Sequence, residues 1–599
     1  MEAYMLTETE FAVLNELRKN PAESQRGLAQ ATDLSVGTIN STIKRFLQLG
    51  YVDGLAITEQ GLTALEPYRV KNAIVMAAGM STRFAPISYE KPKGLLEVRG
   101  ELLIERVIRQ LQEAGITDIT VVVGYKMEQF LFLEDKMNVK IAINTHYDER
   151  NNHSTLKIVE DQLDNTYICC SDNYYTENVF EPYVYQAYYA AVWHDGPTDE
   201  WGIYTSARGR ISKTGPGCAD AWIMYGQAYY DREFSKKFVK ILNEVYDRPE
   251  TKSKLWEEIY ADHIKELDMY IREYPSGIIY EFDSLDELRS FEPDFITNID
   301  SSILDNICST LNVEREALTN FSPIIEGLSN LSFCFEAAGR KYVYRHPGIA
   351  TQGILNRCAE ADAEKIAFEL GLDKTFIHLD PDTGWKLSHY VDVTEHFDYH
   401  NPRHVKQSLD LIRQLHTSGK CIDNRFDIFA ETAKIKERLL GGGQAGAQKR
   451  LDFPDFAELD SRAAKLYQYC QADGIKPVLC HNDFYDPNIL VEGESMYLID
   501  WEYSGMSDYA CDVGVFIGCS DYTFEEALEV INLYFEREPS ASELRHCIAY
   551  VSLASYYWFV WALYKEACNE PVGEYLYLWY RFAKEYGERA LQLYEIGEN

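Results

Sequence analysis

Two segments of the chain place polar residues at spacings that suit phosphate chemistry. The more specific one is residues 481–490, HNDFYDPNIL, which is followed after a predicted strand by residues 499–502, IDWE. In this pattern an aspartate can accept a hydroxyl proton and an asparagine five residues later can reach one magnesium ion. An aspartate ending the next hairpin strand can hold the metal that bridges the phosphates. The segment therefore predicts transfer of a phosphoryl group to an alcohol.

The second segment follows directly after the first buried strand predicted in an α/β region, residues 73–76. It reads AAGMSTRFAP over residues 77–86 and continues with Lys91-Pro92-Lys93-Gly94. Small residues let the backbone approach phosphates, Arg83 can meet a triphosphate, and Lys93 can neutralise charge that develops on the α-phosphate. The spacings match neither the dinucleotide-binding GxGxxG pattern nor the Walker loop.

This second segment resembles the nucleotidyltransferase family that activates sugars and alcohol phosphates. The later pieces at residues 123–125, 144–147 and 151–156 are similar to the bacterial CTP:phosphocholine cytidylyltransferases, and the resemblance covers residues 72–295. It implies that Arg83 and Lys93 are catalytic. It also implies a set of nucleotide-binding residues: Ala78, Gly79, Ser81, Thr82, Tyr125 and Asn144.

Cytidylyl transfer from CTP needs Mg²⁺, which prefers carboxylate oxygens, water and substrate phosphate as ligands. By resemblance the first carboxylate is Asp172, at the end of a predicted strand, and the second is Asp262. Asp283 and Asp286 are the nearby alternatives. Any one of these aspartates can instead be a surface or capping carboxylate.

The acceptor of such an enzyme carries a quaternary ammonium group, which cannot donate a hydrogen bond. Aromatic faces and nearby carboxylates recognise such a cation. Trp201 and Trp256 are similar in position to tryptophans of the phosphocholine enzymes. The alternative for each is an ordinary core residue.

Residues 481–502 resemble the choline kinase and aminoglycoside phosphotransferase superfamily, in which this loop takes the place of the protein-kinase catalytic loop. The resemblance implies that Asp483 is the base and that Asn488 and Asp500 bind Mg²⁺. The remaining implied site residues are Glu502 as a further metal or substrate carboxylate, Ser329 and Asn330 in the phosphate-covering loop, Arg345 in place of the usual strand lysine, and Glu360 as its partner on the following helix.

Substrate choice in this superfamily is expected in the aromatic-rich C-terminal helices. Trp558 and Trp561 resemble the tryptophans of a choline pocket. A spacing of three places both on one helix face, as a cage around a cation requires. An aromatic stripe at helical spacing is the signature of simple core packing as well, which is the alternative.

Residues 1–70 resemble a winged helix-turn-helix domain. Helices are predicted over residues 7–19, 24–31 and 36–49, followed by a hairpin at residues 50–58 and a closing helix. In DNA-binding relatives the third helix enters the major groove, and its polar face here is Ser35, Thr38, Asn40, Ser41 and Lys44. Residues 1–70 hold six Lys/Arg and nine Asp/Glu, a net charge of −3. This charge disfavours DNA binding and favours domain packing or dimerisation.

The 599 residues are predicted to form three domains of a multidomain α/β and α+β protein. They are a winged helix-turn-helix domain at residues 1–70, a Rossmann-like nucleotidyltransferase domain at residues 71–296 and a protein-kinase-like phosphotransferase domain at residues 297–599. The glycine-rich run at residues 441–446 is predicted to be a loop within the third domain.

The composition limits the partners and the compartment. A formal net charge of −37 repels polyanions, which argues against a large nucleic-acid or anionic-membrane footprint and favours cationic ligands. We find no apolar run of about 18 residues and no signal peptide, and the 13 cysteines lack metal-ligand spacing, so we expect reduced core thiols in a cytoplasmic protein.

Together the two resemblances predict consecutive reactions: ATP-dependent phosphorylation of choline, then CTP-dependent cytidylyl transfer to phosphocholine, giving CDP-choline and pyrophosphate with Mg²⁺ as the metal. The first alternative keeps both reactions and changes the alcohol to ethanolamine or another amino alcohol. The second is a metabolite-responsive DNA-binding regulator. Whether the protein forms a homo-oligomer is left open.

Overall fold

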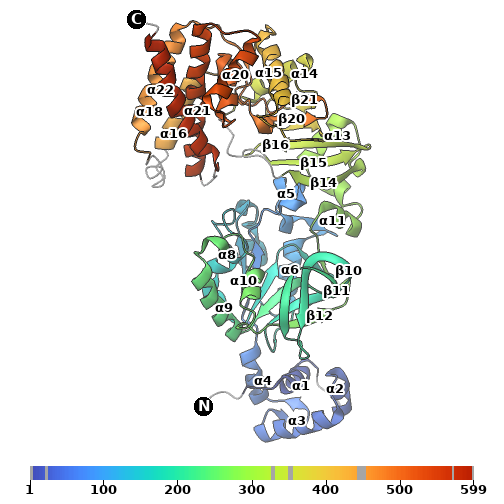
Figure 1. The fold of residues 1–599 in the computed structure, drawn as a ribbon. Helices are drawn as coiled ribbons and strands as arrows, with labels where there is room; N and C mark the ends of the chain where they lie inside the picture. The colour runs from blue at the N-terminus through green and yellow to red at the C-terminus, as the bar shows by residue number, and fades with distance from the viewer. Residues whose placement is uncertain are drawn as a thin grey trace. The chain divides into compact units, whose positions relative to one another are not determined.

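A computed structural model describes residues 5–20, 24–324, 331–348, 355–441, 453–568 and 572–596 of the chain (Figure 1). The chain divides into two compact units, Met1–Asn306 and Ile307–Asn599. This division falls within helix α13 (Ser302–Leu311), and the predicted domain bounds after residues 70 and 296 stay predictions. Of the predicted loop at residues 441–446, Gly441 is the last residue of α16 (Ile428–Gly441), and the others lie outside the described residues.

The N-terminal segment of the first unit has the predicted winged-helix elements. They are α1 (Glu8–Lys19), α2 (Gln25–Ala31), α3 (Val36–Leu49), the short strands β1 (Val52–Asp53) and β2 (Ala56–Ile57), and α4 (Glu59–Leu65). Ser24, Ser35 and Thr58 cap helices α2, α3 and α4 by accepting a backbone N–H with their side-chain oxygens. Apolar residues of α1 and α3 pack into one buried cluster, so the predicted helix periods are confirmed.

Several side chains on the predicted polar face of α3 form hydrogen bonds within the domain. Ser35 Oγ accepts the N–H of Thr38, Asn40 Nδ2 donates to Gln25 Oε1 at 3.1 Å, and Ser41 Oγ donates to the Thr38 carbonyl. Lys44 is exposed. DNA binding by this helix stays a prediction that the net charge of −3 over residues 1–70 disfavours.

The winged helix packs on the residues that precede strand β10 (Tyr188–Thr205). The ring of Tyr185 lies 5.5 Å from Phe11 and stacks on Tyr68 with centroids 5.6 Å apart. Lys19 Nζ lies 2.6 Å from Glu181 Oε1, and the other oxygen of Glu181 receives the guanidinium of Arg272 at 2.8 Å. An ion-pair chain therefore joins α1 to the sheet domain.

The sheet domain is built on seven strands in the order β12-β10-β11-β8-β3-β6-β7. Their bounds are β3 (Asn72–Ala77), β6 (Ile119–Val123), β7 (Lys140–Ile143), β8 (Thr166–Cys170), β10, β11 (Ile211–Tyr230) and β12 (Tyr270–Tyr274). Strands β8, β3, β6 and β7 are parallel, whereas β11 pairs antiparallel with both β8 and β10. The carboxyl ends of the parallel strands therefore meet at one edge of the sheet, where the predicted loop after β3 begins and where Asp172 follows β8.

Helices cover both faces of this sheet, as the alternation along β3 shows. Val75 belongs to a buried cluster that includes α6 (Leu103–Glu113), whereas Ile74 belongs to a cluster that includes α9 (Arg232–Val245) and α10 (Trp256–Asp262). The remaining elements of the unit are β4 (Glu97–Val98), β5 (Glu101–Leu102), β9 (Asn173–Tyr175), β13 (Ile279–Glu281), α5 (Ile87–Glu90), α7 (Phe132–Met137), α8 (His153–Ile158), α11 (Leu285–Phe291), α12 (Phe295–Asn298) and the first residues of α13.

The second unit opens with a five-stranded antiparallel sheet in the order β14-β15-β16-β18-β17. Its elements are β14 (Leu318–Ile324), β15 (Leu331–Ala337), β16 (Arg340–His346), α14 (Arg357–Leu370), β17 (Phe376–Leu379) and β18 (Lys386–His389). Helix α14 follows β16 in the chain, so it corresponds to the helix that was predicted to carry the partner of Arg345.

The rest of the second unit is helical, with two short two-stranded sheets that carry the predicted catalytic loop. The helices are α15 (Pro402–Thr417), α16, α18 (Phe456–Ala472), α19 (Ala510–Gly518), α20 (Phe524–Phe535), α21 (Ala541–Ala567) and α22 (Tyr575–Ile596). Strand β19 (Val478–Cys480) pairs with β22 (Gly505–Ser507), and β20 (Ile489–Glu492) pairs with β21 (Ser495–Leu498).

Helix α21 differs from the expectation that no segment approaches a membrane span in length and composition. It has 27 residues, and an 18-residue window of it is apolar enough to cross a membrane, with a mean hydropathy of 1.3. The same window is 89% buried inside the second unit. The helix is apolar on all sides because α16, α18, α19 and α22 surround it, as expected of a core helix.

Candidate active sites

The first candidate site begins at the carboxyl end of β3, in the loop that carries Arg83. Gly79 and Thr82 are exposed, Ser81 is half-buried with a left-handed φ of 50°, and Ala78 is buried. The Arg83 side chain is 74% exposed, and its Nη1 lies 2.9 Å from Asp283 Oδ2. The loop therefore presents backbone and one guanidinium to solvent, as binding of a triphosphate requires.

Lys93 lies against the end of strand β8. The backbone at Gly94 comes so close to this strand that a Cβ there would lie 2.7 Å from Ser171 Oγ, which explains the glycine. This approach places Lys93 Nζ 2.8 Å from Asp172 Oδ2, with the lysine side chain 7% exposed. Burial by itself would lower the pKa of Lys93, but the carboxylates of Asp172 and Glu281 outweigh it and raise that pKa.

Glu281 is a carboxylate of this site that the sequence analysis missed. Strand β13 pairs with β9 so that Glu281 stands opposite Asn173, and Asn173 Nδ2 donates to Glu281 Oε2 at 3.2 Å. Burial, and next the negative charge of Asp172, raise the pKa of Glu281 to about 8. The pairing of β13 with β9 brings Glu281 to this site from more than 100 residues along the chain, so no local spacing in the sequence marked it.

The structure does not bring Asp262 to this cluster. Asp262 is the last residue of α10, its side chain is 55% exposed, and its Oδ2 lies 2.6 Å from Lys254 Nζ. Asp286 lies beside Arg289 at 3.5 Å. The carboxylates placed around Lys93 and Arg83 are Asp172, Glu281 and Asp283, and Asp262 as a metal ligand stays a prediction that this placement does not support.

Two of the predicted nucleotide-binding residues act within the fold. The backbone N–H of Tyr125 donates to the Ala78 carbonyl at 3.0 Å and so holds the end of β6 against the Arg83 loop. Asn144 is buried, its Nδ2 donates to Ser154 Oγ at 2.8 Å, and its Oδ1 accepts the N–H of His146. Both ends of the Asn144 amide are thereby bonded within the fold, so this side chain shapes the loop after β7.

The predicted tryptophan pair lies in a buried aromatic cluster. Trp256 is 1% exposed because Tyr189 stacks on it with centroids 5.7 Å apart and Tyr230 meets it edge-on. Trp201 is half-buried and packs against the same cluster. In this structure the faces of Trp256 are covered by neighbouring rings, which is the core alternative that the sequence left open.

Glu257, the residue after Trp256, gives this aromatic cluster an acidic group. Its Oε1 accepts the hydroxyl of Tyr189 at 3.3 Å, and its Oε2 accepts Asn152 Nδ2 at 3.1 Å. Burial raises the pKa of Glu257 to about 7. A carboxylate beside aromatic rings is the combination that a substituted ammonium group requires.

The second candidate site is the loop that carries Asp483. Asn488 Nδ2 donates to both the carbonyl and the Oδ2 of Asp483, each at 2.9 Å, so the two predicted residues share one bond network. Burial, and next the charge of Asp500, raise the pKa of Asp483 well above its usual range. Cations bound between these carboxylates would lower that pKa again and favour the ionised form that a base needs.

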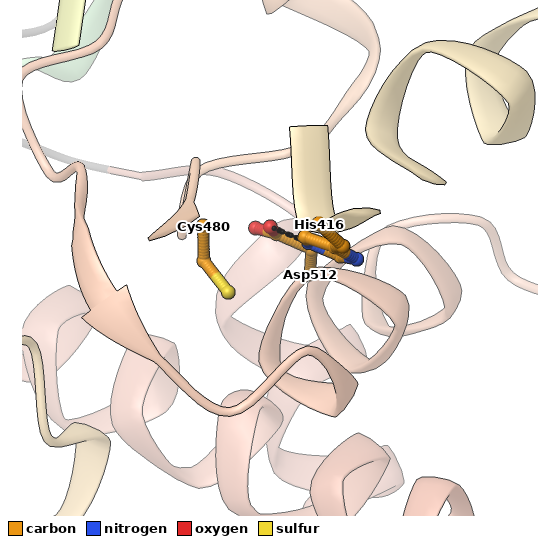
Figure 2. Close-up of side chains that lie close together, drawn as sticks. All are labelled: His416, Cys480 and Asp512. Atoms are coloured by element: carbon orange, nitrogen blue, oxygen red, sulfur yellow. Dashed lines mark hydrogen bonds and ion pairs between the residues drawn. The ribbon is translucent and has the colours of Figure 1, made fainter. Parts of the chain in front are cut away.

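A buried histidine and aspartate hold the backbone of this loop (Figure 2). Asp512 accepts the N–H groups of His481 at 2.9 Å and Asn482 at 2.5 Å, and Asn482 has a left-handed φ of 68°. Figure 2 shows the further bond from His416, whose Nε2 lies 2.8 Å from Asp512 Oδ2. The pair fixes the strained turn directly before Asp483.

Cys480 lies close enough to His416 and Asp512 for the three side chains to be considered as metal ligands (Figure 2). Burial raises the pKa of Cys480 well above its usual range, so the group is a neutral thiol, and its Sγ donates to the Asp508 carbonyl. His416 Nδ1 lies 2.8 Å from the Tyr534 hydroxyl. Since each group already has a hydrogen-bond partner, the cluster is a bond network that supports the loop.

Arg345 lies between Glu360 and the segment that was predicted to bind Mg²⁺. Its Nη1 lies 2.6 Å from Glu360 Oε1 and 3.3 Å from Asp500 Oδ1. Arg357, which the sequence analysis missed, bridges Glu360 at 2.7 Å and Glu502 at 3.3 Å. Burial raises the pKa of Glu502 to about 7. The other two predicted residues of this region, Ser329 and Asn330, lie outside the described residues.

The aromatic residues of the C-terminal helices meet beside the catalytic loop. The ring of Trp558 lies 5.3 Å from Trp561, 5.5 Å from Tyr503 and 5.7 Å from Trp579. Trp558 is buried and Trp561 is half-buried. Tyr503, a member of this aromatic cluster, directly follows Glu502, so the cluster adjoins the acidic segment that contains Asp500 and Glu502.

Asp486 adds a carboxylate on the other side of the same cluster. It accepts the hydroxyl of Tyr575 at 3.1 Å and that of Tyr399 at 3.4 Å. Tyr575 stacks on Trp579 with centroids 5.3 Å apart. Burial raises the pKa of Asp486. The cluster therefore combines ring faces with acids, which favours a cationic alcohol.

Comparisons with known proteins agree with this geometry. Residues 320–545 match the phosphotransferase enzyme family, residues 73–199 the MobA-like NTP transferase domain and residues 6–53 the winged helix-turn-helix DNA-binding family. A choline-phosphate cytidylyltransferase of Streptococcus pneumoniae is 33% identical over 220 residues, 37% of this chain and 96% of that protein. This chain belongs to the cytidylyltransferase family.

Two further relatives are similar to this chain. A 2-aminoethylphosphonate cytidylyltransferase of Lancefieldella rimae is 34% identical over 229 residues, 38% of this chain and 93% of that protein. Protein LicA of Haemophilus influenzae is 25% identical over 260 residues, 41% of this chain and 94% of that protein. The chain is an enzyme in which a cytidylyltransferase domain and a kinase domain follow a winged helix.

Proposed function

We propose that this cytidylyltransferase first phosphorylates choline with ATP and then couples the phosphocholine to CTP, releasing pyrophosphate and CDP-choline. The observation that carries the proposal is the pairing of acids with aromatic rings at both sites. At the kinase site Asp486 accepts the hydroxyl of Tyr575, whose ring stacks on Trp579. At the cytidylyltransferase site the half-buried Glu257 accepts the hydroxyl of Tyr189, and Trp256 supports that ring from the core. One cationic alcohol therefore suits the kinase site as substrate and, once phosphorylated, the cytidylyltransferase site as acceptor.

In the first reaction Asp483 is the base. It takes the proton of the choline hydroxyl, the hydroxyl oxygen bonds to the γ-phosphorus of ATP, and the bond from that phosphorus to the bridging oxygen of ADP breaks. Asn488, which bonds to the Asp483 carboxylate, fixes its direction. Arg345, held by Glu360, supplies a fixed cation for the phosphates.

In the second reaction Lys93 and Arg83 meet the triphosphate of CTP. A phosphate oxygen of phosphocholine bonds to the α-phosphorus, and the bond from that phosphorus to pyrophosphate breaks. Arg83 exchanges Asp283 for the phosphates, and Lys93 neutralises the charge that develops on the α-phosphate while Asp172 holds its ammonium in place.

The acids at each site fit Mg²⁺, which when bound offsets the charge of the nucleotide phosphates. Asn488 and Asp500 would hold it at the kinase site. Asp172 and Glu281 would hold it at the cytidylyltransferase site, where a bound cation would offset the burial and the charge of Asp172 that raise the pKa of Glu281. We place both reactions in the cytoplasm, a reducing compartment that suits 13 free thiols.

A substrate panel tests the proposal. ADP release is measured with choline, ethanolamine and an aminoglycoside, and pyrophosphate release from CTP with phosphocholine, phosphoethanolamine and 2-aminoethylphosphonate. We expect the highest kcat/KM with choline and phosphocholine. Preference for ethanolamine and phosphoethanolamine would support the same two reactions with ethanolamine as the alcohol. Preference for 2-aminoethylphosphonate at the second site would show that the cytidylyltransferase does not use the product of the kinase.

A further inference from the structure

A side chain near the cytidylyl-transfer site makes bonds that the proposed chemistry does not use. Glu90 ends helix α5, three residues before Lys93, and its carboxylate receives the N-terminus of helix α13. The backbone N–H of Ser302 donates to Glu90 Oε1 at 2.8 Å, that of Ile303 at 3.1 Å and the Ser302 hydroxyl at 2.5 Å. The hydroxyl of Ser301 donates to the other oxygen, Oε2.

Glu90 and Ser301 together satisfy the first N–H groups of α13. Ser301 is buried, and its Oγ accepts the N–H of Leu304 at 3.2 Å as an N-cap does. A carboxylate that faces the first turn of a helix is further stabilised by the helix dipole. Ile303 and Leu304 are buried, which anchors the turn that Glu90 caps.

The segment from Glu90 to Gly94 is short and fixed at both ends. At its start the Lys91 N–H donates to the Ile87 carbonyl at 2.9 Å, and Pro92 restricts the backbone that follows. At its end Gly94 packs on Ser171. Lys93 lies between these two points of attachment and places its Nζ 2.8 Å from Asp172.

We propose that Glu90 is a positioning residue for cytidylyl transfer, holding residues 90–94 against the first turn of α13 so that Lys93 stays beside Asp172. The inference rests on the proposed role of Lys93 in that reaction. Residues 301–303, which bind Glu90, were predicted from sequence to lie in the phosphotransferase domain. The cytidylyltransferase site therefore depends on a helix outside its predicted domain.

Variants of the full chain test this inference, each with kcat and KM for CTP measured on whichever acceptor the wild-type enzyme uses. Glu90→Ala is expected to lower kcat about tenfold, because Lys93 acts on charge that develops during the reaction, with a small change in KM. Glu90→Gln keeps one oxygen acceptor and is expected to recover much of the rate. ADP release by the kinase site should equal that of the wild type in both variants.

Glu292→Ala is the matched control, since Glu292 accepts the backbone N–H of Arg99 at 2.7 Å but does not touch residues 90–94. A Lys93→Ala background separates positioning from general damage: Glu90→Ala should then cause no further loss of kcat. Amide exchange should rise at residues 91–96 and 302–304 in Glu90→Ala and stay unchanged in Glu292→Ala.

Three results would overturn the inference: an unchanged kcat in Glu90→Ala, the same fold-loss with and without Lys93, or unchanged exchange at residues 91–96. None of these depends on choline being the alcohol. If the wild-type protein releases no pyrophosphate from CTP with any acceptor, the proposed function fails by itself, and the exchange measurement still decides whether Glu90 fixes the Lys93 segment.

Discussion

At the scale of single residues, Glu281 makes the cytidylyltransferase site sensitive to pH. Its pKa is raised to about 8, so below that pH the free site holds a proton that Mg²⁺ must displace. We expect the Mg²⁺ concentration for half-maximal pyrophosphate release to fall as the pH rises toward about 8. Glu281→Gln should remove this slope and weaken Mg²⁺ activation about tenfold.

Asp262→Asn is the control for Glu281, because Asp262 is exposed and lies beside Lys254. It should behave as the wild type. A Glu281→Gln variant with an unaltered pH slope, or an Asp262→Asn variant that needs far more Mg²⁺, would return the second metal ligand to the residue that the sequence suggested.

His416 is predicted to control the kinase reaction without touching its substrates. It supports Asp512, which holds the backbone before Asp483, so His416→Ala should lower kcat for ADP release about tenfold and leave pyrophosphate release from CTP unchanged. Cys480→Ala should keep a rate near that of the wild type. Equal losses in the two variants, together with metal bound by the purified protein, would favour a metal at this cluster.

Residues within a motif could be predicted from sequence, whereas residues that approach it from far along the chain could not. Asp483 and Asn488 are five residues apart and bond to each other, so their spacing carries the information. Glu281 reaches Asp172 only through the pairing of β13 with β9, and His416 reaches the loop through Asp512. No local spacing encodes these long-range contacts.

At the scale of helices and strands, His546 ties helix α21 to its surroundings by charge. Its ring nitrogens lie 2.8 Å from Asp473 and 2.9 Å from Asp508. Burial alone would lower the pKa of His546, but the bond to Asp508 leads the contributions that raise it to about 10. The folded protein therefore binds this proton more tightly than the unfolded chain, whose histidine has its usual pKa of about 6.5.

The stabilising effect of His546 is complete below about pH 6.5 and is lost as the pH rises toward about 10. We expect the urea concentration at the midpoint of the transition that exposes α21 to fall over this pH range. Amide exchange in residues 541–567 measures that transition. His546→Asn should be less stable at pH 6 and show a flatter dependence. A wild-type midpoint that is constant from pH 7 to pH 10 would contradict the assigned charge state.

Regular periods made the helices of residues 1–70 predictable, but the long hairpin of β10 and β11 was not. Gly196, Pro197 and Gly202 are residues that usually mark turns, yet the strand continues through them by shifts of register. Gly202 pairs with both Gly215 and Ile223, so the hairpin folds back on itself. The conformation of such a segment is determined by pairing between strands, not by the local preferences of its residues.

At the scale of the whole molecule, the place where the chain is cut should decide whether the cytidylyltransferase works alone. Residues 1–296 end before Ser301, Ser302 and Ile303, which bind Glu90, whereas residues 1–311 keep all of α13. We expect pyrophosphate release by residues 1–296 to be about tenfold slower than by residues 1–311. Equal rates from two folded fragments would show that the predicted bound at residue 296 is sufficient.

The two consecutive reactions are tested most directly by following choline, ATP and CTP with the purified protein by mass and phosphorus NMR. Wild-type protein should form phosphocholine and then CDP-choline. Asp483→Asn should form neither from choline but should form CDP-choline when phosphocholine is added, and Asp172→Asn should stop at phosphocholine. Formation of CDP-choline from choline by Asp483→Asn, or consumption of neither choline nor phosphocholine by the wild type, would contradict the account.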